Sequence, residues 1–111
     1  MSLARLAAES VAQCPTATLT PGPGSRWLTS EGSDAIRGVV ASVQPDGRYE
    51  LELHLVVAWP PGPLTLLAGQ LRCRLHAASQ AAGLEGQLGQ MQIYIDGVQD
   101  PEDRASAREL A

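Results

Sequence analysis

The segment from Tyr49 to Trp59 alternates between apolar and polar residues. A period of two places successive side chains on opposite faces of a β-strand. The odd-numbered residues from Leu51 to Val57 therefore face a core. The opposite face carries Glu50, Glu52 and His54 and is directed at solvent, at least at its start. The next residue on that face is a valine, which indicates that something covers its far end.

A second β-type run extends from Ile36 to Val43 and is joined to this strand by the sequence Gln-Pro-Asp-Gly-Arg. A Pro-Asp-Gly sequence between two β-type runs is typical of a hairpin turn, and Gly47 supplies the positive φ that the turn needs. We therefore predict a β-hairpin from Ile36 to Trp59. A further alternating run, from Gln90 to Asp96, predicts a closing strand with its methionine and isoleucines directed inward.

Two segments have the apolar spacing of amphipathic helices. The first covers residues 2–14, with Ser2 as its N-cap and Cys14 on its buried stripe. The second covers about 63–82 and ends before Gly83, which is well placed for a left-handed cap. The buried stripe of this long helix consists of Leu64, Leu67, Ala68, Leu71, Leu75, Ala78 and Ala82.

Between the first helix and the hairpin, Thr16 to Thr20 reads as a short strand, and a polar stretch follows from Pro21 to about Asp34. A loop of this length is uncommon in a compact domain and indicates a functional or mobile segment, or a weak strand. Trp27 lies in the middle of the stretch and indicates that part of it docks on the core.

These elements predict one small α+β domain over residues 1–99, with the element order α-β-β-β-α-β. The chain has 111 residues, which is room for a single core. Residues 100–111 are expected to form a short C-terminal helical tail, because Asp-Pro-Glu-Asp is a helix-start sequence.

The chain has a net charge of −4, and all eight of its basic residues are arginines spread along the sequence. A negative surface without a basic patch repels phosphate, so nucleic-acid binding is not expected. No stretch approaches the roughly 18 apolar residues of a membrane span. The first helix carries Arg5 and Glu9 and no aromatic residue, so direct membrane insertion is not expected either. We predict a soluble cytoplasmic protein with both cysteines as free thiols.

Few residues have the spacing of a chemical site. Cys73 and His76 are three apart on the long helix, which suits one edge of a metal site, but a zinc site needs further ligands. Glu50 and Glu52 point the same way without apolar neighbours, which is typical of a solvated face. Trp59 is interpreted as a lid over the sheet edge rather than as a ligand-stacking ring. We therefore expect no enzyme activity, no cofactor and no intrinsic metal.

A candidate interaction surface lies on the side of the long helix that the core stripe does not use, where Leu66, Cys73 and Ala77 share an angular sector. Apolar groups there favour a covering partner, so we expect a homo-oligomer formed through this surface or through β-edges. Trp27 is added to the candidate interaction surface because it lies in the unusually long loop. The alternative is a small-molecule- or metal-binding regulatory domain, with the Trp27 loop as a lid over Cys73 and His76.

The chain from about Leu3 to Val98 resembles the alkaline shock protein 23 family, also called the cell-envelope stress response family. The resemblance lies in apolar alternation rather than in a catalytic motif. Two departures are Pro15-Thr-Ala, where members commonly have Pro-Gly-Val, and Trp59-Pro-Pro-Gly, where they have an aromatic residue and a glycine. The similar stretches are Leu3-Ala-Arg-Leu-Ala-Ala, Ile36-Arg-Gly-Val-Val, Leu53 to Trp59 with Gly62, and Gln92-Ile-Tyr-Ile-Asp-Gly-Val98.

The resemblance implies a three- to four-stranded mixed sheet with helices packed on one face. It also implies a non-enzymatic bacterial protein of the general or envelope stress response, acting through protein–protein interaction. Such a protein self-associates and stays near the membrane through a membrane-anchored protein partner.

Overall fold

The computed structural model describes residues 2–31 and 33–99, and these form an α+β domain. The predicted tail over 100–111 lies outside the described residues. The elements in chain order are α1 (Leu3–Ala12), β1 (Ala17–Leu19), η1 (Pro23–Ser25), β2 (Leu28–Glu31), β3 (Asp34–Arg37), β4 (Val39–Val43), β5 (Tyr49–Ala58), α2 (Leu64–Ala81), η2 (Glu85–Gln87) and β6 (Leu88–Gln99).

Strand β5 is the centre of a four-stranded mixed sheet. Strand β6 pairs with it in parallel along one edge. Strands β1 and β4 share the other edge, where both pair antiparallel to β5, β4 with its first half and β1 with its second. The parallel pair is possible because α2 carries the chain from the end of β5 back to the start of β6. The fold class predicted from the sequence is therefore confirmed.

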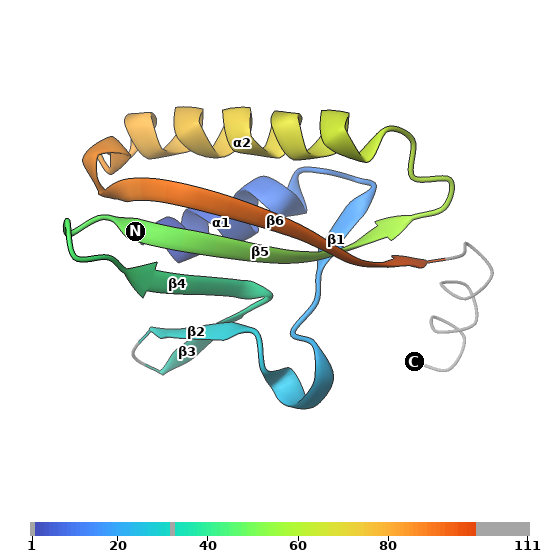
Figure 1. The fold of residues 1–111 in the computed structure, drawn as a ribbon, viewed down its shortest axis with the longest axis horizontal. Helices are drawn as coiled ribbons and strands as arrows, with labels where there is room; N and C mark the ends of the chain where they lie inside the picture. Colours follow the sequence, from blue (N-terminus) through green and yellow to red (C-terminus); the bar gives the residue numbers. More distant parts are fainter. Residues whose placement is uncertain (1, 32, 100–111) are drawn as a thin grey trace.

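Both helices cover one face of the sheet, as Figure 1 shows, with α1 behind the strands and α2 along the β6 side. The inward side chains of β5, from Leu51 to Val57, are almost fully buried against them, as predicted. Helix α2 contributes Leu67, Leu71 and Leu75 to this core. We call the opposite face, which no helix covers, the outer face.

The helix ends follow the sequence signals. The Oγ of Ser2 accepts a hydrogen bond from the amide of Arg5 at 3.1 Å, as expected of an N-cap. Gly83 has φ +73° and ends α2, and the amide of Leu84 donates to the carbonyl of Ser79 at 2.7 Å. No helix in the described part of the chain is long and apolar enough to span a membrane.

The predicted hairpin arm from Ile36 to Val43 is not one strand, and this prediction is wrong in detail. Gly38 divides the arm with φ +83°, so that β3 precedes it and β4 follows it. A Cβ at Gly38 would lie 2.7 Å from the Cβ of Leu19, so only glycine fits here. Strand β3 pairs instead with β2 in a separate two-stranded sheet, which accounts for the unusually long loop.

Replacing Leu71 by alanine should lower the free energy of unfolding by about 2–5 kcal/mol, because the change leaves a cavity in the core. Leu71 is 1% exposed, whereas Leu66 on the same helix is 58% exposed. Leu66→Ala should therefore change the stability by less than about 0.5 kcal/mol. Urea denaturation followed by circular dichroism measures both, and equal losses in the two variants would contradict the packing described.

Candidate functional site

Three rings stack across the outer face of the sheet. The indole of Trp27 lies on the imidazole of His54, with centroids 3.9 Å apart and planes inclined by 5°. The other face of the imidazole lies on the ring of Tyr94, at 4.9 Å and 8°. His54 is consequently only 5% exposed, although its strand position faces away from the core. The cover expected at the far end of this face thus begins at His54, and the prediction that His54 faces solvent is wrong.

Two carboxylates bond to the nitrogens of this imidazole. The Nδ1 of His54 lies 3.0 Å from the Oδ2 of Asp96, and its Nε2 lies 3.4 Å from the Oε2 of Glu52. Both carboxylates can accept a hydrogen bond at the same time only when both ring nitrogens carry a proton. The imidazole thus lies between an acid on β5 and an acid on β6, within hydrogen-bond distance of each.

The backbone of His54 holds the segment that supplies Trp27. Its amide donates to the carbonyl of Gly38 at 2.9 Å, and its carbonyl accepts from the amide of Thr20 at 2.9 Å. These two bonds lie where the edge of β5 passes from β4 to β1. The segment between Thr20 and Gly38 therefore leaves the sheet and returns to it beside a single residue, His54. This segment includes η1, β2 and β3.

Trp27 is fixed from both sides of its ring. A Cβ at Gly22 would lie 2.4 Å from the indole, so the glycine backbone packs directly against the face opposite His54. The amide of Trp27 donates to the carbonyl of Pro21 at 2.8 Å, and its carbonyl accepts from the amide of Gly38 at 2.7 Å. The result is a column, in the order Gly22, Trp27, His54, Tyr94, which we call the ring column.

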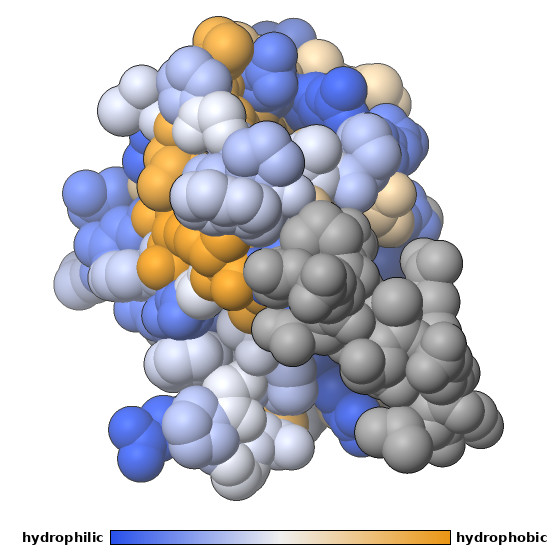
Figure 2. Space-filling view, turned by 90° about the vertical axis from the view of Figure 1, so that its right-hand side faces the viewer, coloured by the Kyte–Doolittle hydropathy of each residue, from blue (hydrophilic) through white to orange (hydrophobic). Residues whose placement is uncertain are grey.

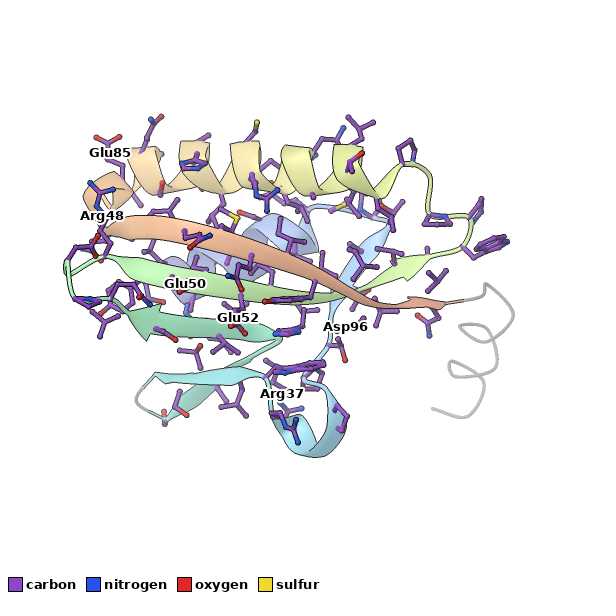
Figure 3. All side chains as sticks on the ribbon, viewed as in Figure 1. Arg37, Arg48, Glu50, Glu52, Glu85 and Asp96 are labelled. Atoms are coloured by element: carbon purple, nitrogen blue, oxygen red, sulfur yellow. The ribbon has the colours of Figure 1, made fainter. Side chains whose placement is uncertain are left out.

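The ring column ends at Tyr94, which is 41% exposed on β6. Its hydroxyl donates to the side chain of Gln92 on the same strand. Figure 3 shows Glu50, Glu52 and Asp96 on this same outer face, spread over β5 and β6. The side chains of Glu52 and Asp96 remain 37% and 28% exposed. The outer face thus presents a stacked tyrosine ring beside three carboxylates, two of them within hydrogen-bond distance of His54.

Three of the residues predicted to form an interaction surface lie on the exposed side of α2, and the fourth, Trp27, lies elsewhere. Leu66, Cys73 and Ala77 are all exposed on α2, and Leu66 and Cys73 line one shallow depression there. Trp27 instead belongs to the ring column. Figure 2 shows hydrophobic side chains gathered at the end of the molecule where β5 ends and α2 begins, and Leu66 is exposed on the first turn of α2 there.

The alternative site is not assembled either. His76 is exposed on α2 beside Cys73, while Trp27 contacts His54. Among residues 2–31 and 33–99, no group of three or more His, Cys, Asp or Glu side chains has the arrangement of a metal site. Trp59 is 57% exposed, so its interpretation as a lid over the sheet edge is wrong.

The sequence reasoning missed the ring column, although part of the signal was present. His54 in Leu-His-Leu and Tyr94 in Ile-Tyr-Ile each occupy an outward position between inward apolar residues. A parallel pairing of the two strands places these residues side by side, as observed. The contribution of Trp27 had no such signal, because it depends on the fold of the long loop.

Gly22→Ala tests how tightly the column is packed. The new Cβ would collide with the indole, and overpacking of this kind costs about 1–3 kcal/mol in addition to the backbone strain at φ +72°. In a Trp27→Ala background the backbone strain persists but the collision disappears. The cost of Gly22→Ala should therefore fall by the overpacking part, about 1–3 kcal/mol.

Gly24→Ala is the control for this cycle, because a Cβ at Gly24 would meet nothing within 4 Å. Its cost should be the same with and without Trp27. Urea denaturation of the single and double variants gives the coupling energy. If Gly22→Ala costs the same in both backgrounds, the indole does not pack on Gly22.

No family model matches the chain, and no curated protein or solved structure matches it. The resemblance to the alkaline shock protein 23 family continues to rest on the stretches quoted for it. Function is therefore inferred from the chain's own residues.

Proposed function

We propose that the protein is a non-enzymatic interaction module whose binding surface is the outer face of the sheet. The observation that carries the proposal is that Glu52 and Asp96 lie within hydrogen-bond distance of the buried His54, beside the exposed ring of Tyr94. A surface whose side chains are already ordered loses little conformational entropy on binding, which favours affinity.

The chemistry of this surface favours a basic protein segment. A carboxylate forms strong, charge-assisted hydrogen bonds with an arginine side chain. Glu50, Glu52 and Asp96 supply three such carboxylates on this face. A partner with exposed arginine or lysine residues is therefore the one that this face would recognise.

The resemblance extends the proposal to a bacterial stress response in which a membrane-anchored protein recruits this one. One structural fact supports a protein rather than the lipid as the anchor. The apolar stripe of α1, the first helix, is buried in the core, with Leu3, Leu6 and Val11 each at most 7% exposed. That stripe is not free to enter a bilayer without unfolding the domain.

The proposal is tested by fractionation and by charge reversal. The pure protein should not float with anionic liposomes, but it should sediment with membranes in a lysate of its native host. Glu50→Arg should reduce the sedimenting fraction, with about a tenfold loss of affinity, because a charged hydrogen bond contributes roughly 1.5–3 kcal/mol.

Glu85→Arg is the matched control, since it changes the net charge equally at an exposed residue of η2 away from this face. It should sediment like the original protein. Liposome binding by the pure protein would contradict recruitment by a protein, and equal loss in the two variants would contradict the outer face as the binding surface.

A further inference from the structure

One edge of β6 has no strand partner among the described residues, because β6 pairs with β5 alone. The strand is 12 residues long and contains no proline, and Asp96 is its single charged residue. The Nη2 of Arg72 donates to the carbonyl of Met91 at 3.3 Å, so this carbonyl points away from β5. The pairing with β5 is regular from Met91 to Ile95, with register shifts on either side, and backbone groups alternate along a regular strand, so the amides and carbonyls of Ile93 and Ile95 point to the same open edge. The regular open edge from Met91 to Ile95 is a template for another strand.

The ring column ends at this same edge. It advances by one ring per strand, from His54 on β5 to Tyr94 on β6, over 4.9 Å. That distance matches the roughly 4.7–4.9 Å between neighbouring strands of a sheet. A strand added to the edge of β6 would therefore place its own side chain on the exposed face of Tyr94. Two independent features, the unpaired backbone of β6 and the open end of the ring column, thus favour the addition of a strand at this edge.

We propose that the added strand is β6 of a second copy of this chain, paired antiparallel about a two-fold axis at Tyr94. In this register, Tyr94 stacks on Tyr94 of the second copy. Ile93 lies opposite Ile95, and Gln92 lies opposite Asp96, each twice because of the symmetry. The proposal goes beyond the interaction with a basic partner, because it concerns the pure protein alone.

The register is self-complementary at each of these positions. Ile93 and Ile95 are only partly buried on the core face, and pairing them covers both. The amide of Gln92 can donate to the carboxylate of Asp96, so no like charges meet. Moving the axis to Ile93 or Ile95 shifts the register by two residues and would place Gln92 or Asp96 against the ring of Tyr94. The bond from Arg72 to Met91 lies outside the paired segment Gln92–Asp96 and is unaffected.

Backbone geometry agrees with this register. The open edge exposes the amides and carbonyls of Ile93 and Ile95, which then exchange hydrogen bonds across the axis. Tyr94 becomes a non-hydrogen-bonded pair, the kind in which Cα atoms approach to about 4.5 Å and side chains lie closest. The two four-stranded sheets form one continuous sheet, and both outer faces lie on the same side.

Gln92→Glu tests the contact between Gln92 and Asp96. The change preserves the shape and the acceptor for the hydroxyl of Tyr94, but it places two pairs of like charges across the interface. The dissociation constant of the dimer, measured by sedimentation velocity, should rise about tenfold. The double variant with Asp96→Asn should restore it. Within one chain Gln92 neighbours Glu52, which His54 links to Asp96, so the rescue is measured on the dissociation constant of the dimer and not on the stability of the domain.

Two controls locate the interface. Gln90→Glu makes the same charge change on the same strand outside the paired segment, and it should leave the dimer intact. Leu66→Glu alters the exposed face of α2 and should also leave the dimer intact. Dissociation by Leu66→Glu together with an intact Gln92→Glu dimer would overturn the proposal. A wild-type protein that is monomeric at every concentration would also overturn it. So would a double variant, Gln92→Glu with Asp96→Asn, that stays dissociated.

A disulfide measures the register directly. In a Cys73→Ser background, Tyr94→Cys should oxidise to a covalent dimer, because the two Cα atoms at the axis are within the range a disulfide spans. Gln90→Cys should not, because its two copies lie far apart on either side of the axis. Cross-linking at Gln90 with none at Tyr94 would refute the register.

Discussion

His54 is the one residue of β5 whose backbone bonds to both ends of a long excursion of the chain. Its amide and carbonyl hold Gly38 and Thr20, while its imidazole carries Trp27, which the excursion delivers. These bonds are possible because β1 and β4 leave a gap of one residue along a shared edge of β5. The outer face therefore acquires its order from a single strand position, and the carboxylates around it are ordered by the same side chain.

The two faces of the sheet are covered by different physical means. Helices α1 and α2 bury leucine and valine side chains on one face, where the stabilisation scales with the apolar area removed from water. On the other face, stacked rings bury a histidine, while the two acids beside it stay partly exposed. Stacked aromatic pairs contribute roughly 0.5–1.5 kcal/mol beyond area burial, and their parallel geometry imposes direction as well as energy. The outer face is thus small in buried area but specific in arrangement.

Local sequence signals were sufficient for the elements that periodicity governs. The alternation of β5, the cap at Ser2 and the end of α2 at Gly83 all depend on residues close in the chain. The division at Gly38 was not predictable in this way, because it depends on Leu19, which is distant in sequence. The site followed the same rule. The outward positions of His54 and Tyr94 were readable, but the position of Trp27 depends on a loop whose strands have no clear alternation.

The meeting of Thr20 and Gly38 on one residue has a consequence for evolution. A segment whose two ends are held together can gain or lose residues at little entropic cost, since loop closure depends only weakly on length. Residues between these ends could therefore be inserted, deleted or exchanged as a cassette while β1, β4 and β5 keep their pairing. Retention of one aromatic residue over His54 is the condition that such changes would have to meet. Descendants of this chain should vary in length here before they vary within the sheet.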